Sequence, residues 1–202
     1  KDTELKPLVR WQFRGGIPES ERKAFLFNNV TDSRGNKYEI PLVVGALATT
    51  PEIYGIGMGV PVSDIGEHWK KALAAPISPV EVQDAPCHEV ILTGADIDGE
   101  GKGLDALPVP ISTPGFDVAP YLTATSCISR DPDTGVQNMG TYRGGIKAPD
   151  RIGLKMFVNL RQGGHAHWDK YKARGEKMPM AIMVGCPPAL AYVSPQKIRE
   201  GI

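Results

Sequence analysis

The apolar residues in the first half of the chain form short runs that predict strands separated by helices. In the run WQFRGG (residues 11–16) aromatic residues alternate with polar ones, which predicts a short strand ending at the glycines. Residues 24–30 predict a second strand, and DSRGN at 32–36 predicts the turn that follows it. Residues 40–47 are nearly all apolar, which is typical of a strand covered on both faces.

Two helices are predicted after this last strand. The sequence TPE at 50–52 is a typical helix start, with an N-cap residue, a proline in the first turn and an acid that complements the helix dipole. A second helix is predicted after Ser63, because acidic residues come early in it and Lys71 comes late. This alternation of strands and helices predicts an α/β domain over residues 1–105.

The composition changes near residue 105, where we place a domain boundary. Glycines and charges dominate DIDGEGKG (96–103), and four prolines lie between residues 107 and 120. An EF-hand calcium loop would require an acid where Leu107 stands, and a Walker phosphate loop would require Ser or Thr where Gly103 stands. The run is therefore interpreted as a solvent-exposed loop.

A β-hairpin is predicted in the second half of the chain. Residues 120–130 are rich in threonine, serine and β-branched side chains and predict one strand, and residues 136–146 predict its partner. The connecting DPDTG (131–135) is typical of a tight turn, with proline preset for the second position and glycine for a positive φ. Its carboxylates could also bind a cation, although turn chemistry alone accounts for them.

The clearest candidate chemistry lies in NMGTYR (138–143), on the second arm of this hairpin. Strand alternation places Asn138 and Tyr142 on one face, and Thr141 and Arg143 on the other. Because an unpaired buried charge is costly, Arg143 either faces a phosphate or carboxylate or lies in water on an edge strand.

Residues 166–175 predict a helix, and MAIMVG (180–185) predicts a buried strand. The preceding QGGHAH (162–167) has two interpretations. Backbone N–H groups at a glycine-rich helix start can bind phosphate. His165 and His167 would share a face only in a strand, so a metal role for the pair is the weaker interpretation.

Composition excludes several classes of protein. The 202 residues include 23 basic and 23 acidic ones, so the formal net charge of zero gives no electrostatic case for a nucleic-acid or membrane-surface partner. No apolar run is long enough to span a bilayer, and no signal peptide opens the chain. The three cysteines, Cys87, Cys127 and Cys186, favour a reduced, cytoplasmic protein without disulfides.

Taken together, these residues resemble the UbiD family of reversible (de)carboxylases, which use prenylated FMN. The resemblance is most specific in PYLTATSCISRDPDTGVQNMGTYR (120–143), where a strand, an acidic hairpin and an Asn-x-Gly-x-Tyr-Arg arm occur in the family's order. FLFNNV (25–30), PCHEVILTGADID (86–98) and KARGEKMPMAIMVGCPP (172–188) also agree. The resemblance implies that residues 106–202 are the first part of a split β-barrel flavin-binding domain, which makes the whole α+β.

The resemblance also implies roles for individual residues. Asn138 matches the family's ligand for a divalent metal, usually manganese, that bridges to the flavin phosphate. Arg143 matches the arginine that faces the substrate carboxylate and is the candidate catalytic residue. A potassium ion is a further implied cofactor. The implied contacts to the prenylated flavin are Thr141, Tyr142, Arg143, Phe157, Val158, Asn159, Gln162 and Gly163.

Three features depart from the family's pattern. The metal-binding histidine is expected near Met156 or Phe157, where this chain has none. The metal-ligating glutamate, and the acids that shuttle the proton, are expected beyond Ile202, and the family's chains are more than twice this length. The chain is therefore expected to be the first part of such an enzyme or a separate subunit. It would act as a homo-oligomer or with a polypeptide that supplies the missing half.

The resulting hypothesis is part of a cytoplasmic enzyme that decarboxylates or carboxylates an aromatic or α,β-unsaturated acid, with CO2 as product or co-substrate. A flavin prenyltransferase would supply the cofactor, whose ring provides an electron sink that side chains cannot provide. Two alternatives stay open. One is a non-catalytic flavin-holding or structural subunit of a multi-subunit carboxylase, and the other is a simple FMN-binding module of the split-barrel type.

Overall fold

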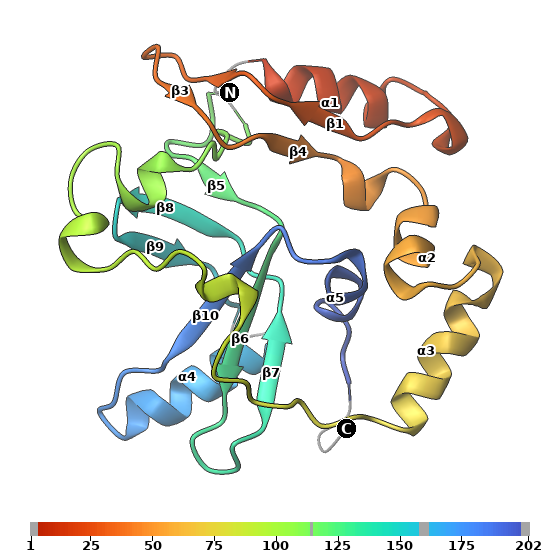
Figure 1. Ribbon diagram of the computed structural model, residues 1–202, viewed down its shortest axis with the longest axis vertical. Coiled ribbons are helices and arrows are strands. Elements are labelled where there is room, and N and C mark those ends of the chain that lie inside the picture. Colours follow the sequence, from red (N-terminus) through yellow and green to blue (C-terminus); the bar gives the residue numbers. More distant parts are fainter. Residues whose placement is uncertain (1–3, 114, 158–161, 199–202) are drawn as a thin grey trace.

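The computed structural model describes residues 4–113, 115–157 and 162–198, which form short helices and small sheets (Figure 1). The helices are α1 (Leu5–Arg14), α2 (Glu52–Met58), α3 (Ile65–Ala74), α4 (Gly163–Ala173) and α5 (Pro188–Val193). Single 3-10 turns lie at Glu19–Glu21, Ala46–Ala48, Val62–Asp64, Pro86–His88, Gly94–Asp96 and Gly103–Ala106. Within the described part of the chain, no helix combines the length and apolar character needed to cross a bilayer.

The strands form four small sheets. They are β1 (Phe25–Phe27), β2 (Val30–Thr31), β3 (Lys37–Tyr38), β4 (Leu42–Val44), β5 (Tyr121–Leu122), β6 (Thr125–Arg130), β7 (Gln137–Gly140), β8 (Gly144–Ala148), β9 (Arg151–Leu154) and β10 (Met180–Val184). The strand orders are β1–β4, β2–β3, β10–β6–β7 and β5–β8–β9, and the pairings among these strands are antiparallel. The predicted mixture of helix and sheet is confirmed.

Residues 11–14 belong to α1, so the strand predicted at 11–16 is wrong. Leu5 and Gln12 are the buried residues of this helix, and they lie two turns apart on one face. The Gln12 side chain donates to the Lys23 carbonyl at 2.6 Å and accepts from the Lys23 N–H at 2.5 Å. Trp11 lies on the outer face of the helix, where it is 63% exposed, so this aromatic residue does not mark the buried face of a strand.

The N-terminal strands are shorter than predicted. The strand expected over 24–30 is divided into β1 and β2, whereas the turn predicted at 32–36 is confirmed by the Asp32 carboxylate, which accepts the Arg34 N–H at 2.9 Å. The strand expected over 40–47 is limited to β4, and Val43 is 55% exposed. It is therefore not covered on both faces.

Both helices predicted in the first half are confirmed, and helix α5 packs against α2 and meets α3 through one ring contact (Figure 1). A Cβ on Gly57 of α2 would lie 2.8 Å from the Pro188 side chain. The Tyr192 ring meets those of Tyr54 and Trp69 edge-on, at centroid distances of 5.5 and 5.7 Å. Residues far apart in sequence are joined here by close helix packing.

Each arm of the predicted hairpin is divided into two strands, which belong to different sheets. The strand expected over 120–130 is divided into β5 and β6, and the one expected over 136–146 into β7 and β8. β6 pairs with β7 and β10, whereas β5 pairs with β8 (Figure 1). The Thr125 hydroxyl donates to the Tyr142 carbonyl at 2.5 Å and links the two breaks. Residues 141–143 therefore lie at the junction of two sheets.

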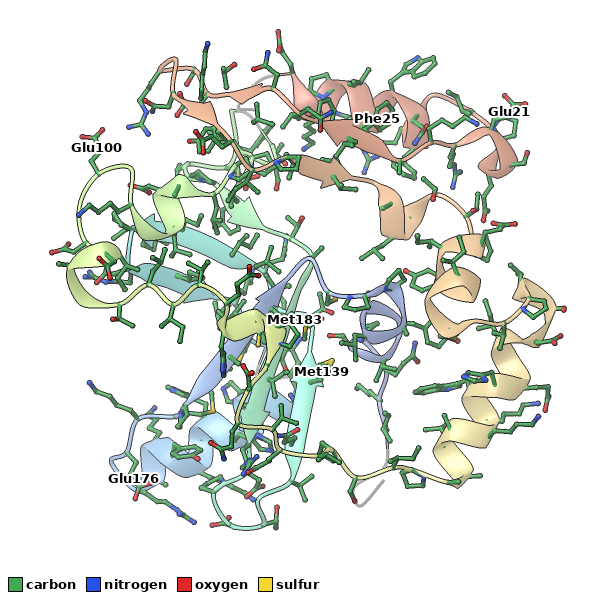
Figure 2. All side chains as sticks on the ribbon, viewed as in Figure 1. Glu21, Phe25, Glu100, Met139, Glu176 and Met183 are labelled. Carbon is green, nitrogen blue, oxygen red and sulfur yellow. The ribbon has the colours of Figure 1, made fainter. Side chains whose placement is uncertain are left out.

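The buried apolar core is small and lies beside β5 and β8. Val109, Leu122 and Ile146 form it, and the partly buried Leu104, Leu107 and Ile152 pack against it. Met139 of β7 and Met183 of β10 lie on the two strands that flank β6 (Figure 2). β10 is a strand as predicted, but it is only partly buried, since Val184 is 56% exposed.

We expect Gln12→Ala to destabilise the chain by about 1–3 kcal/mol, because the variant leaves the N–H and C=O of Lys23 without their partner. Urea unfolding followed by circular dichroism measures this. Gln83→Ala, at an exposed position, is the matched control and should change the free energy of unfolding by less than about 0.5 kcal/mol. Equal stability of the two variants would contradict the role of Gln12.

Candidate functional site

The candidate site is built on the turn between β6 and β7. The predicted turn at 131–135 is confirmed, because the Asp131 N–H donates to the Val136 carbonyl at 2.9 Å and Gly135 has a φ of 74°. This φ lies in the left-handed region that favours glycine. The Asp131 carboxylate accepts the N–H groups of Asp133 at 2.8 Å and Thr134 at 3.3 Å. The first residue of the turn therefore closes it.

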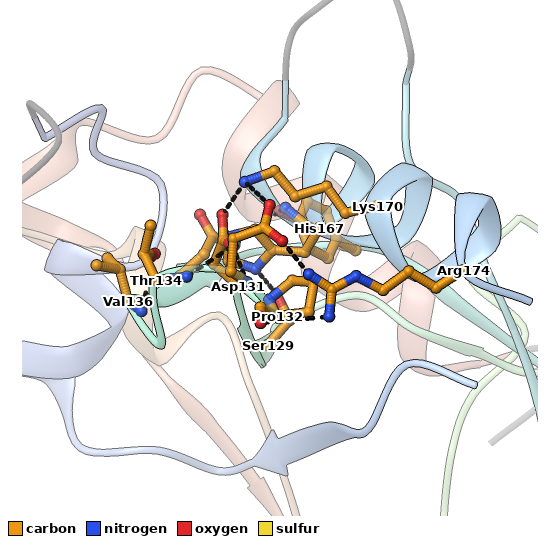
Figure 3. Close-up of polar contacts among 12 residues, drawn as sticks. Ser129, Asp131, Pro132, Thr134, Val136, His167, Lys170 and Arg174 are labelled. Carbon is orange, nitrogen blue, oxygen red and sulfur yellow. Dashed lines mark hydrogen bonds and ion pairs between the residues drawn. The ribbon is translucent and has the colours of Figure 1, made fainter. Parts of the chain in front are cut away.

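Helix α4 lies against this hairpin through three polar layers, two of which appear in Figure 3. The inner layer is Gly163–Gly164, the middle layer is His167, and the outer layer is Lys170 with Arg174. These positions recur every three or four residues and so lie on one face of the helix. The helix is therefore held by polar contacts on that face.

His167 forms the middle layer and is buried, with 8% exposure. Its Nδ1 lies 3.0 Å from Ser129 Oγ, and its Nε2 lies 3.8 Å from Asp131 Oδ2. Burial lowers the pKa of His167, the charge of Asp131 opposes this, and the charge of Lys170 adds to it. A neutral ring that points Nε2–H toward Asp131 accepts the Ser129 hydroxyl at Nδ1.

The outer layer pairs the carboxylates of the turn with cations. Lys170 Nζ lies 2.5 Å from Asp131 Oδ2 and 3.0 Å from Asp133 Oδ2, and Arg174 also pairs with Asp133 (Figure 3). The hydrogen bond from Lys170 is the main reason that the pKa of Asp131 falls to about 2. These carboxylates are therefore engaged by the chain's own cations.

The inner layer brings together three of the predicted site residues, Asn138, Tyr142 and Gly163. Tyr142 is 4% exposed, and its Oη accepts the Gly164 N–H at 3.0 Å and the Asn138 side-chain N–H at 3.3 Å. Asn138 and Tyr142 therefore share the face that strand alternation assigned to them.

Glycines at this layer allow an approach that a larger residue would prevent. A Cβ on Gly163 would overlap Asn138 Oδ1, and a Cβ on Gly140 would overlap Tyr142 Oη. A Cβ on Gly164 would lie 2.8 Å from the Tyr142 ring. None of the three has a positive φ, so the requirement is for space rather than for an unusual backbone angle.

Thr141 and Arg143 are exposed, on the other side of the junction. The Thr141 hydroxyl lies 2.9 Å from the hydroxyl of Ser194, which is 2% exposed. The Arg143 guanidinium makes no ion pair with any described residue. It is therefore a cation available to an anionic ligand.

The remaining predicted flavin contacts precede α4. Gln162 is the residue before the helix, and its Oε1 accepts the Phe157 N–H at 2.7 Å. The Phe157 ring is 41% exposed and lies 4.8 Å from Lys155 Nζ. Val158 and Asn159 lie outside the described residues.

The start of α4 offers fewer unused N–H groups than the sequence suggested. The helix begins at Gly163, and the Gly164 N–H is already bound to Tyr142. The N–H groups of His165 and Ala166 both point to the Gln162 carbonyl, at 3.0 and 3.1 Å. The Gly163 N–H has no acceptor among the described residues, so it is the donor best placed for a phosphate.

Metal ligands are scarce at this site. The described residues contain no group of three His, Cys, Asp or Glu side chains placed to hold a metal ion. His165 and His167 diverge, because His165 pairs with Asp169 at 3.1 Å whereas His167 faces Ser129. Asn138 can supply one oxygen ligand to a metal ion.

Sequence reasoning missed Ser129 and Ser194 as parts of the site, and it considered His167 only as a metal ligand. The signal for His167 was available, because glycine, histidine and lysine recur at helical spacing opposite an acidic turn. Ser129 is paired with Asn138 across the β6–β7 ladder, so register could have placed it. Ser194 reaches Thr141 only through tertiary packing, and no local pattern indicates it.

Comparison with known proteins identifies the family. Residues 78–202 match the model of the UbiD family, described as a 3-octaprenyl-4-hydroxybenzoate carboxy-lyase Rift-related domain. The chain belongs to the UbiD family. It is 31% identical over 189 residues to an uncharacterized protein in the cooM 5′ region of Rhodospirillum rubrum, covering 91% of this chain and 36% of that protein. The chain thus spans about a third of the length of this relative.

Solved structures show the same fold. The UbiD-class enzyme HmfF from Pelotomaculum thermopropionicum, in complex with FMN, is 32% identical, with a TM-score of 0.70 over 82% of this chain and 35% of that one. The decarboxylase AroY from Klebsiella pneumoniae, acting on 3,4-dihydroxybenzoic acid, is 24% identical, with a TM-score of 0.67 over 82% of this chain and 33% of that one. The vanillic acid decarboxylase of Sedimentibacter hydroxybenzoicus is 20% identical, with a TM-score of 0.74 over 96% of this chain and 40% of that one.

We expect Gly163→Ala to displace Asn138 and to cost about 1–3 kcal/mol, as overpacking does in close contacts. Chemical denaturation measures the cost. Gly66→Ala, in α3 where a Cβ would meet no atom within 4 Å, is the matched control and should stabilise the chain by about 0.5–1 kcal/mol. Opposite signs for the two glycines support the close approach, and a neutral Gly163→Ala would refute it.

The lowered pKa of His167 predicts a pH dependence of stability. The unfolded histidine binds a proton near pH 6.5. The folded one binds it only at lower pH, so the free energy of unfolding falls as the pH drops from about 7 through this window. His167→Asn should cost about 1–3 kcal/mol at pH 7.5, and its deficit should shrink at pH 5. His68→Asn, exposed on α3, is the matched control and should cost less than about 0.5 kcal/mol at pH 7.5. A deficit that stayed constant with pH would exclude titration of His167.

Proposed function

We propose that this chain forms part of a reversible (de)carboxylase that acts on an aromatic or α,β-unsaturated carboxylic acid with prenylated FMN as cofactor. The observation that carries the proposal is the junction at residues 138–143 within the UbiD-family region, where Asn138 meets the start of α4 and Arg143 is exposed. HmfF, at 32% identity, has been solved with FMN and, in an evolved dimeric form, with prFMN.

The described residues fit the phosphate end of a flavin. The Gly163 N–H has no acceptor among them, and the absence of a Cβ at Gly163 lets the Asn138 amide lie directly against the start of α4. Asn138 would supply one ligand to a divalent cation, proposed to be manganese. The described residues contain no group of three His, Cys, Asp or Glu side chains that would complete this site, and a potassium ion is a further proposed cofactor.

Arg143 is proposed to orient the substrate carboxylate. Its guanidinium can hold a carboxylate through two parallel hydrogen bonds, and no described acid competes for it. Loss of CO2 leaves an electron pair on the substrate, and the flavin supplies the electron sink when bound. Thr141, Phe157 and Gln162 are proposed to line the same cofactor. Val158 and Asn159 are further proposed contacts.

The domain division is also proposed, with a boundary near residue 105 and the first part of a split β-barrel over 106–202. We propose a cytoplasmic assembly with other copies or with a second polypeptide. Several apolar side chains support such an assembly, because they are exposed: Ile77 by 94%, Val80 by 83%, Phe116 by 85% and Val118 by 91%. A flavin prenyltransferase is the proposed source of the cofactor.

A non-catalytic flavin-holding subunit is the second candidate. The observation that favours it is that the described part of the chain contains no group of three His, Cys, Asp or Glu side chains placed to hold a metal ion. The two candidates differ in turnover, since both would bind the flavin.

We expect Arg143→Ala to lower kcat/KM about 10- to 100-fold, the loss typical of a charge-assisted hydrogen bond. CO2 release from aromatic and acrylic acids would be measured on the protein that contains this chain, loaded with prenylated FMN. Arg151→Ala, an exposed arginine on β9, is the matched control and should retain activity. Full turnover by Arg143→Ala would overturn its role. Tight flavin binding by the unmodified protein with no turnover would favour the second candidate.

A further inference from the structure

Tyr142 occupies the centre of the inner layer, although it lies two residues beyond the end of β7 and belongs to no strand. Its carbonyl accepts the Thr125 hydroxyl at 2.5 Å, which fixes the backbone, and its ring is buried to 4% exposure. Added Cβ atoms at Gly140 and Gly164 would strike this ring or its hydroxyl from two sides. The position of the ring is therefore set by packing, independently of its hydroxyl group.

The Tyr142 hydroxyl oxygen accepts two N–H groups from different elements. One is the Gly164 N–H of α4 at 3.0 Å, and the other is the Asn138 side-chain N–H of β7 at 3.3 Å. A phenolic oxygen has two lone pairs, so these donors use its acceptor capacity. The hydroxyl joins the hairpin to the helix start at the point where both approach a ligand.

This arrangement also orients the Asn138 amide. Because Nδ2 donates to Tyr142, Oδ1 is turned toward Gly163. The first residue of α4, whose N–H suits a phosphate, therefore lies against Asn138 Oδ1, an oxygen suited to a cation. Without the Tyr142 acceptor, the amide would be free to rotate, and Gly164 would lose the bond that holds its N–H inward.

We infer that Tyr142 is a positioning residue, which holds Asn138 and the start of α4 in register for the cofactor phosphate without touching the cofactor itself. This inference rests on the proposed function. It replaces the direct flavin contact that the family resemblance implied for this residue. Its burial beneath the glycines supports the indirect role.

The test is Tyr142→Phe, which removes the hydroxyl and keeps the ring. FMN binding would be measured by quenching of flavin fluorescence, on the protein that contains this chain. We expect about tenfold weaker binding, the change that the loss of one or two hydrogen bonds produces. Tyr121→Phe is the matched control, because the Tyr121 hydroxyl on β5 has no hydrogen-bond partner among the described residues, and it should bind FMN within twofold of the unmodified protein.

A double-mutant cycle with Asn138→Ala separates positioning from direct contact. If Tyr142 acts through Asn138, Tyr142→Phe should weaken FMN binding less than threefold in the Asn138→Ala background. An undiminished tenfold effect there would overturn the part of the inference that runs through Asn138.

Hydrogen exchange at the Gly164 amide, measured without flavin, gives a second readout. Exchange should be about tenfold faster in Tyr142→Phe and unchanged in Tyr121→Phe. Unchanged exchange in Tyr142→Phe would overturn the inference whatever the binding data show. If the unmodified protein failed to bind FMN, the proposed function would fail, and the exchange result would still decide whether Tyr142 positions α4.

Discussion

The approach of helix α4 to the β6–β7 hairpin is the contact on which the rest of the site depends. At the inner end the elements meet so closely that Gly163 has no room for a side chain. Further along, the buried pair of Ser129 and His167 and the charged pair of Asp131 and Lys170 keep the same separation. The apolar core lies elsewhere, so polar bonds of fixed length set the geometry here.

Local chemistry made the hairpin predictable. The DPDTG turn is specified by residues whose backbone preferences do not depend on the rest of the protein, and alternation then placed Asn138 and Tyr142 on one face. Residues 11–14 were wrongly predicted because two aromatic residues two positions apart are too short a pattern to distinguish a strand from a helix. Deciding between the two required the contact between Gln12 and Lys23, which no local pattern contains.

The candidate site was predictable in its residues and less so in its contacts. Sequence indicated glycines at the start of α4, but it could not distinguish glycines that free N–H groups from glycines that allow close packing. In the structure, Gly164 allows close packing against Tyr142, and its N–H is not free because it donates to the Tyr142 hydroxyl. Likewise, the predicted strand is interrupted after Gly140 because its two halves join different sheets. The hydrogen bond from Thr125 to the Tyr142 carbonyl, which connects the two interruptions, is a contact between residues distant in sequence.

The polar stripe on α4 has a consequence for how this region can change in evolution. A helix advances about 100° per residue, so one residue inserted between Gly164 and His167 would turn every later layer away from the hairpin. Substitutions on the outer face of α4 leave the stripe in place. The length of the segment from Gly163 to Arg174 should therefore be preserved more strictly than its composition, so homologues should differ there by replacement and not by insertion or deletion.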